Sequence, residues 1–267
     1  MTTMTPSTLA THVLHDGAGV PLVLLHGFPL DHRMWNPVVA ELPPGLRVVA
    51  VDLPGFGHSD LGQLPPTLEA AADAVHAALR AAGEGNGAVV GMSMGGYVAL
   101  ALAERHPEIV QGLGLVDTKS TADTDEARAG RLAAARTVAD SQTLDAVMGM
   151  PDKLLGPTSQ MERRSLYPTV YDWIRSQSPS AVAWAQRAMA ARPDRTDVLH
   201  RFPGPVAVVV GAEDSITPID EAKHMVDAAS DATLHVVANA AHLSTIEEPA
   251  AVAHALAALQ ERVVAQL

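Results

Sequence analysis

The stretch Ala88-Val-Val-Gly-Met-Ser-Met-Gly-Gly-Tyr97 decides the fold. Its first residues predict a short buried strand, and the Ala- and Leu-rich residues that follow predict a helix to about His106. A G-x-S-x-G turn between a strand and a helix is the pattern of a nucleophile elbow. The turn is too sharp for a side chain at Gly91 or Gly95, and it lifts the Ser93 hydroxyl away from the backbone. The alternative is an ordinary Ser in a Gly-rich turn, but the flanking strand and helix favour the elbow.

Composition limits the classes of protein that remain. A chain of 267 residues fits one large α/β domain with an insertion. Cysteine is absent, which fits a reducing compartment, and the net charge of −12 argues against nucleic acid or an anionic membrane as a partner. Residues 1–8 lack the basic and apolar segments of a signal peptide, and no apolar run is long enough for a membrane helix. We therefore expect a cytoplasmic protein that acts on a small molecule. The sequence leaves its oligomeric state open.

Short apolar runs alternate with helical segments over most of the chain. Strands followed by helices imply parallel pairing with right-handed crossovers, and hence an open α/β sheet. The expected strands cover 9–15, 21–25, 47–51, 88–90, 109–116, 206–210 and 232–237. The expected helices of this part cover about 32–42, 67–82 and 247–266 besides the helix after the elbow, and one more starts at Pro218. We assign residues 1–118 and 201–267 to this core.

The alternation stops between residues 119 and 200, where no convincing strand is found. This part predicts three or four helices, over about 124–139, 143–150, 159–176 and 179–191. We expect them to form a helical cap, inserted before the strand that leads to Asp214. Most of its apolar side chains are expected to form a small core of their own. Trp184, Met189 and Met148 are the candidates for lining a substrate pocket.

Three residues that suit nucleophilic catalysis each follow an expected strand. They are Ser93, Asp214 and His242, in that order along the chain. The carboxyl ends of parallel strands lie along one edge of a sheet, so these side chains are expected to meet there. A Ser hydroxyl needs a base to remove its proton, and the base needs an acid that orients it. The sequence therefore predicts a Ser-His-Asp triad.

Five motifs in order resemble those of the α/β-hydrolase fold family, and they cover the chain outside the insertion. They are His26-Gly-Phe-Pro29, Asp52-Leu-Pro-Gly-Phe-Gly-His-Ser59, Gly91-Met-Ser-Met-Gly-Gly96, Gly211-Ala-Glu-Asp-Ser-Ile-Thr-Pro218 and Ala241-His-Leu-Ser-Thr-Ile-Glu-Glu-Pro249. Within that family the chain looks like the carboxylesterases, the 3-oxoadipate enol-lactonases and the cofactor-free perhydrolases. The end of the insertion, Trp184-Ala-Gln-Arg-Ala-Met-Ala-Ala-Arg-Pro-Asp194, is similar to the last cap helix of enol-lactonase-like members.

This resemblance implies an oxyanion hole formed by the backbone N–H groups of Phe28 and Met94, and it implies no cofactor. Dehalogenases and many epoxide hydrolases of this fold have Asp at the elbow, so Ser93 argues against those reactions. Our leading hypothesis is a serine hydrolase that cleaves a small carboxylic ester or lactone through an acyl-enzyme. Enol-lactonase or perhydrolase (haloperoxidase-like) activity is the alternative, the latter because Pro29 also occurs in perhydrolase-like members. A ligand receptor that retains the fold is a third possibility.

The other polar residues near these motifs receive structural interpretations. We expect His26 to orient its own loop, Asp52 to buttress the loop 52–59, and Glu213 to point away from the triad. His32 and His58 are interpreted as solvated loop residues. The histidines show no metal-ligand spacing such as H-E-x-x-H, so we predict no metal site.

Overall fold

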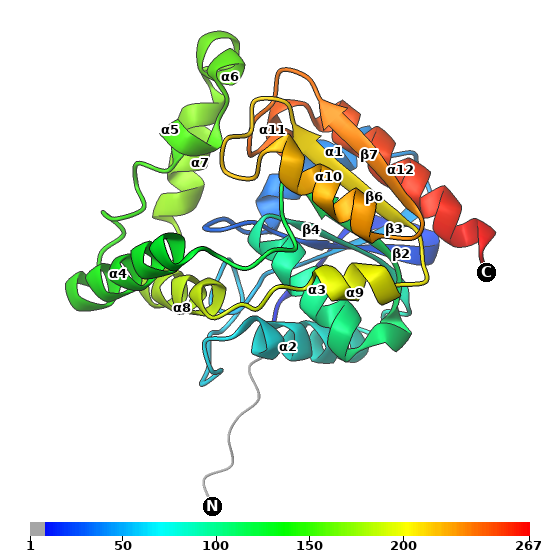
Figure 1. The fold of residues 1–267 in the computed structure, drawn as a ribbon, viewed down its shortest axis with the longest axis horizontal. Coiled ribbons are helices and arrows are strands. Elements are labelled where there is room, and N and C mark those ends of the chain that lie inside the picture. The colour runs from blue at the N-terminus through cyan, green and yellow to red at the C-terminus, as the bar shows by residue number, and fades with distance from the viewer. Residues whose placement is uncertain (1–8) are drawn as a thin grey trace, which may run out of the picture.

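Strand β4 (Gly87–Met92) lies at the centre of a seven-stranded sheet with the order β1-β3-β2-β4-β5-β6-β7 (Figure 1). The structure is a computed structural model and describes residues 9–267, so the expectation for residues 1–8 lies outside it. The other strands are β1 (Thr11–Asp16), β2 (Ala18–Leu25), β3 (Leu46–Val51), β5 (Val110–Val116), β6 (Val206–Gly211) and β7 (Ala232–Val237). Strands β2 to β7 pair in parallel, whereas β1 runs antiparallel to β3 at the edge.

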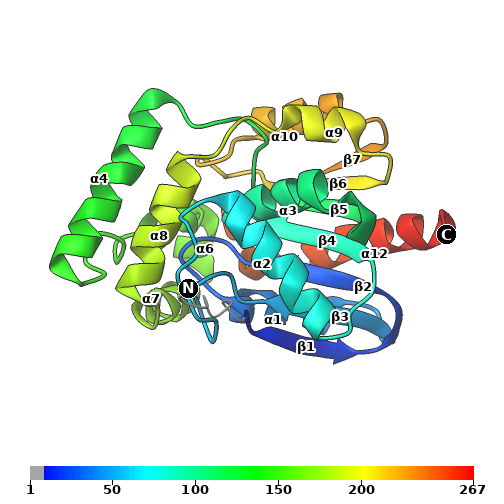
Figure 2. The same cartoon turned by 90° about the horizontal axis from the view of Figure 1, so that it is seen from below.

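Helices cover both faces of this sheet (Figure 2). On one face α3 (Met94–Arg105) packs on the central strands with α2 (Leu68–Ala81) beside it, and α10 (Ile219–Ala228) packs on β6 and β7. On the other face lie α1 (Asn36–Glu41) and α12 (Pro249–Ala265). Every residue of β4 and β6 is buried, as expected for parallel strands covered on both sides. The predicted α/β-hydrolase architecture, with a mostly parallel sheet, is confirmed.

Five helices between β5 and β6 lie beyond one end of the sheet, on the left of Figure 1. These insertion helices are α4 (Asp125–Ser141), α5 (Pro151–Leu154), α6 (Pro157–Glu162), α7 (Leu166–Arg175) and α8 (Pro179–Ala190). A further helix, α9 (Thr196–Arg201), packs against α3 and α10 of the core. The chain enters and leaves the insertion side by side, because the Arg195 N–H donates to the Ser120 carbonyl (2.9 Å) and the Ser120 and Thr196 hydroxyls are hydrogen-bonded (2.9 Å).

Some predicted helices are wrong in detail. Residues 143–150 form turns, because the segment is short and contains Gly149, a poor helix former. The predicted helix 159–176 is two helices, because Pro168 cannot stand inside a helix but fits the first turn of α7. The helix predicted over 32–42 is a 3₁₀ turn, η1 (His32–Trp35), followed by α1. The last predicted helix, 247–266, corresponds to α12. A short helix that was not predicted, α11 (Ser244–Glu247), precedes it, with Glu248 between them in a non-helical conformation.

Candidate active site

Ser93 stands between β4 and α3 with a backbone φ of 49°, in the region that disfavours ordinary side chains. Residues at the end of β5 and just after it hold Ser93 there. The Ser93 N–H donates to the Val116 carbonyl (2.9 Å), and the Thr118 hydroxyl donates to the Ser93 carbonyl (2.8 Å). The strained turn is thus fixed by two hydrogen bonds from outside it, which is how such a conformation persists in a folded protein.

Two glycines permit the turn. A Cβ atom on Gly91 would lie 2.1 Å from the Gly95 carbonyl oxygen, and a Cβ on Gly95 would lie 2.2 Å from the carbonyl oxygen of Leu25. Both distances are far below van der Waals contact, so the elbow closes only without side chains at these positions. The approach of Gly95 to Leu25 also brings the end of β2 against the start of α3. This places the Phe28 loop beside the elbow.

His242 bridges Ser93 and Asp214. Its Nε2 lies 2.9 Å from the Ser93 Oγ, and its Nδ1 lies 2.8 Å from the Asp214 Oδ2. His242 and Asp214 are buried, whereas Ser93 is half-buried. The Asp214 carboxylate also accepts hydrogen bonds from the Thr217 hydroxyl (2.7 Å) and from the Ile216 N–H (2.8 Å). The structure therefore brings together the three residues that the strand ends predicted, in hydrogen-bonding order.

The electrostatic environment of His242 and Asp214 supports a role for His242 as the base. Burial alone would lower the pKa of the imidazole, but its hydrogen bond to the Asp214 carboxylate and the negative charge of Asp214 outweigh burial, and the pKa of His242 is raised above 6.5. Burial likewise favours the neutral form of Asp214, yet the hydrogen bonds from His242 and Thr217 lower the pKa of this carboxyl below its usual value. At neutral pH Asp214 is therefore ionised and can stabilise a positive charge on His242.

The loop after β2 carries Phe28, and His26 holds this loop in place. The His26 ring lies 2.9 Å from the Gly27 carbonyl through Nδ1, and its Nε2 accepts the Leu53 N–H (2.9 Å). This confirms the interpretation of His26 as a structural residue. Met94 is the first residue of α3, where backbone N–H groups lack partners within the helix. A Cβ on Gly27, the residue before Phe28, would lie 3.5 Å from the Ser93 Cβ, so this loop passes beside the elbow. The role of Phe28 and Met94 as an oxyanion hole stays a prediction.

Sequence reasoning missed two buried carboxylates around His242. Asp117, directly after β5, accepts from the Gly211 N–H (2.9 Å) and from the N–H and hydroxyl of Ser244 (3.1 and 2.6 Å). Burial, with the nearby charge of Asp214, raises the pKa of Asp117 to about 7. The sequence did contain a signal for Asp117, because this residue directly follows an expected strand and therefore lies at the same edge of the sheet as the triad.

The second missed residue is Glu247, which is buried. One carboxylate oxygen accepts the N–H groups of Ala241 (2.9 Å) and Leu243 (3.2 Å), the neighbours of His242. The other oxygen accepts from the Gly156 N–H (2.8 Å) and the Ser159 hydroxyl (2.6 Å) of the insertion. Glu247 therefore ties the His242 loop to the insertion.

Three other interpretations can be checked by contacts. Glu213 accepts hydrogen bonds from the N–H and hydroxyl of Thr158, so it points away from the triad, as expected. Asp52 accepts the N–H of His58 (2.9 Å) in its own loop, as expected of a buttress. The interpretation of His32 as a solvated residue is wrong, because its side chain is 13% exposed and its ring bonds to Asp52 (2.9 Å).

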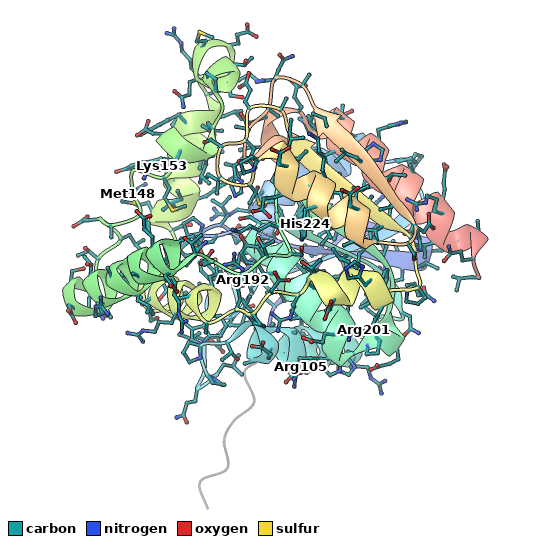
Figure 3. All side chains as sticks on the ribbon, in the orientation of Figure 1. Arg105, Met148, Lys153, Arg192, Arg201 and His224 are labelled. Atoms are coloured by element: carbon teal, nitrogen blue, oxygen red, sulfur yellow. The ribbon has the colours of Figure 1, made fainter. Side chains whose placement is uncertain are left out.

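The candidate pocket residues have structural contacts of their own. The indole N–H of Trp184, on α8, donates to the Leu64 carbonyl of the core (2.9 Å). The sulfur of Met189 accepts from Arg131 (3.4 Å), and both residues belong to insertion helices. Figure 3 shows Met148 among the insertion elements, farther from the core than Arg192. Whether these side chains line a pocket stays a prediction.

Comparisons with known proteins identify the fold and the class of enzyme. A family model described as the alpha/beta hydrolase fold matches residues 20–249. A thermophilic esterase from Thermogutta terrifontis is 34% identical, with a TM-score of 0.90 over 96% of this chain and 93% of that chain. The pimeloyl-(acyl-carrier protein) methyl ester esterase of Chromobacterium violaceum is 31% identical over 85% of this chain and 88% of that protein. The enol-lactonase from Burkholderia xenovorans, 22% identical with a TM-score of 0.83 over 95% of this chain and 96% of that chain, shows the shared fold alone.

The chain belongs to the α/β-hydrolase fold family. Two relatives above 30% identity are named as esterases, so the predicted class of enzyme, a carboxylic ester hydrolase, is confirmed. Within residues 9–267, no helix combines the length and the apolar character that crossing a membrane requires.

Proposed function

We propose that this protein is a serine hydrolase that cleaves a small carboxylic ester or lactone through an acyl-enzyme on Ser93. The observation that carries the proposal is the position of His242, which lies within hydrogen-bonding distance of both Ser93 (2.9 Å) and Asp214 (2.8 Å). That arrangement supplies a nucleophile, a base and an orienting acid in one line.

In the proposed reaction, His242 Nε2 removes the Ser93 proton as Oγ attacks the substrate carbonyl. The negative charge that develops on the carbonyl oxygen is stabilised by the backbone N–H groups of Phe28 and Met94. The imidazolium of His242, stabilised by Asp214, then protonates the leaving alcohol oxygen. Water, deprotonated by the same imidazole, attacks the acyl-enzyme and releases the acid.

We propose that the insertion helices form the cap over this site and end before α9, which packs with the core. Two observations support the cap. Glu247 joins the insertion to the loop of His242, and Trp184 of α8 bonds to the core at Leu64. Apolar side chains of the insertion, such as Trp184 and Met189, favour a neutral or short acyl group over a strongly charged one. The named methyl ester substrate of the Chromobacterium relative supports an ester over a lactone.

The experiment is a panel of p-nitrophenyl esters of increasing chain length and a panel of lactones, each with and without hydrogen peroxide. Ester turnover that disappears in Ser93→Ala supports the proposal. A serine-directed phosphonate should label the peptide that contains Ser93 and no other. Labelling that persists in Ser93→Ala contradicts the nucleophile. Turnover of lactones alone would indicate a lactonase instead of an esterase. Turnover only in the presence of peroxide would indicate a perhydrolase. Binding without turnover indicates a receptor.

A further inference from the structure

Three histidines surround the buried carboxylate of Asp52. None of these four residues belongs to the triad. Asp52 follows β3, and its side chain is fully buried. The Nε2 of His12, on β1, lies 2.8 Å from its Oδ2, and the Nδ1 of His32, in η1, lies 2.9 Å from its Oδ1. His58, in the loop after β3, has its Nδ1 4.0 Å from the same carboxylate. The rings of His12 and His32 stack with centroids 3.6 Å apart.

Four different donor atoms thus converge on a small volume. One nitrogen from each histidine and one Asp52 oxygen all lie within 4.8 Å of one another. In a tetrahedral Zn²⁺ site with bonds near 2.0–2.1 Å, neighbouring donor atoms are about 3.3 Å apart. The histidine nitrogens lie 2.8 to 4.0 Å from the Asp52 oxygens, on both sides of that value, so small side-chain movements would bring the donor atoms to the spacing of a Zn²⁺ site.

The charge of the cluster also favours a cation. Within residues 9–267, the ion pairs that Asp52 forms are all with histidines. The nearby Arg33 directs its guanidinium to the Asp31 carboxylate instead (2.7 Å). The Asp52 carboxylate also accepts the backbone N–H groups of His32 and His58 (2.9 Å each). Burial opposes ionisation of this carboxyl, but these hydrogen bonds and the one with the His32 ring hold its pKa below the usual value, so Asp52 is ionised. A divalent cation would add positive charge beside this buried carboxylate and use the lone pairs of unprotonated imidazole rings.

We propose that His12, His32, His58 and Asp52 form a site for a divalent transition metal ion, with Zn²⁺ as the ion that these donors suit best. Three imidazoles and one carboxylate are typical ligands of Zn²⁺. The site is reachable, because the His58 side chain is 75% exposed and borders a cavity of about 260 Å³ that His32 and Gly57 also line. No pair of these histidines has the short spacing of a metal motif, so the sequence gives no signal of it.

A bound ion would join three segments of the core: β1, η1 and the loop after β3. His32 is four residues beyond Phe28, so the metal would also stiffen the far end of the loop that carries Phe28. The site does not depend on the proposed hydrolysis, and its effect is expected in stability first.

The test uses the full-length protein without a polyhistidine tag, dialysed against chelator and then titrated with ZnCl₂ by calorimetry. We expect one Zn²⁺ per chain, a higher Tm with Zn²⁺, and the visible bands of tetrahedral Co²⁺ when CoCl₂ replaces it. His58→Ala should weaken Zn²⁺ binding by at least about tenfold, the size of effect that the loss of one contact at a metal site causes. It should leave the Tm of the metal-free protein unchanged, since the His58 side chain is exposed. His12→Gln should abolish the Co²⁺ bands.

The matched control is His76→Ala, which removes a ligand from a second group of possible donors, His76, His106 and Glu108. It should leave Zn²⁺ binding intact. Absence of saturable binding to the wild-type protein overturns the proposal. So does binding that is unchanged in both His58→Ala and His12→Gln, or binding that is lost in His76→Ala.

Discussion

The Asp117 carboxylate accepts two hydrogen bonds from Ser244, one from its hydroxyl at 2.6 Å and one from its N–H at 3.1 Å, although the two residues are 127 positions apart. Ser244 is two residues beyond His242. The other Asp117 oxygen accepts the Gly211 N–H at the end of β6, the strand that leads to Asp214. One buried side chain therefore fixes the loops of both the base and the acid. We regard Asp117 as a positioning residue.

The first prediction follows from this arrangement. Asp117→Ala leaves the Gly211 and Ser244 N–H groups without their acceptor, so His242 should shift and kcat should fall about 10- to 100-fold, as a displacement of about 1 Å can cause. The pKa of Asp117 is about 7, so its carboxylate is charged only over the upper part of the acid limb of the kcat/KM profile. That charge helps to raise the pKa of His242, so its loss should move the limb to lower pH. Ser244→Ala, which removes one of these bonds, is the milder control. An unchanged kcat and pH profile in Asp117→Ala would show that Asp117 only stabilises the fold.

The second prediction concerns pH. His242 acts as a base only when neutral, and its pKa is raised above 6.5, so the imidazole stays protonated to a higher pH than free histidine does. The acid limb of kcat/KM should therefore have its midpoint above 6.5. Asp214→Asn removes the charge that raises this pKa, so the limb should move to lower pH, and kcat should fall on the order of 10⁴. A midpoint below 6.5 in the wild-type enzyme would contradict the assignment.

Glu213→Gln is the matched control for the acid, because Glu213 is adjacent to Asp214 and contacts Thr158 instead of His242. It should retain kcat within a few-fold of the wild type. If Glu213→Gln were inactive while Asp214→Asn stayed active, the acid would be one residue earlier than we place it.

The third prediction concerns Glu247. All four of its partners are hydrogen-bond donors, so in Glu247→Gln the amide nitrogen must face a donor. We expect a lower Tm and a lower kcat, since the variant disturbs both the insertion contact and the His242 loop. Glu248→Gln is the control, because Glu248 is more exposed and pairs with Arg163, and such pairs contribute little to stability. Equal effects of the two substitutions would refute a special role for Glu247.

The fourth prediction tests the insertion as a cap. Met189→Ala should change the preference among ester chain lengths more than it changes Tm. Trp184→Phe keeps an aromatic ring but loses the hydrogen bond to Leu64, so it should loosen the contact between α8 and the core. Met161→Ala is the control, because that side chain is 65% exposed. If Met189→Ala and Met161→Ala gave the same substrate profile as the wild type, the insertion would have no part in substrate selection.

The sheet and the three triad positions could be predicted from sequence because both depend on local patterns. Apolar runs mark parallel strands, and the ends of such strands meet at one edge, so Ser93, Asp214 and His242 could be placed together without coordinates. The need for Gly91 is local in the same way, because a Cβ there would collide with Gly95 inside the turn, whereas Gly95 is also required by its approach to Leu25 of β2.

Contacts between distant side chains could not be predicted in this way. The partners of Asp117 and Glu247 are set by the packing of loops that lie far apart in the chain, and no spacing rule identifies them. The cluster around Asp52 was missed for the same reason, because His12 reaches it from the antiparallel edge strand β1. The division between α6 and α7 had a local cause in Pro168, and a stricter application of helix rules would have found it.

The side-by-side passage of the chain at Ser120 and Arg195 has a consequence for how such an enzyme can change over evolution. The whole segment between Ser120 and Arg195 leaves the core and rejoins it at one place. We call this place the neck, and the hydrogen bond from the Arg195 N–H to the Ser120 carbonyl closes it. A shorter, longer or foreign segment grafted at that neck need not separate β5 from β6, the strands whose ends carry Asp117 and Asp214. Exchange of this segment can thus change substrate preference while those two strands stay in place, but the new segment must supply donors for Glu247, which now bonds to Gly156 and Ser159.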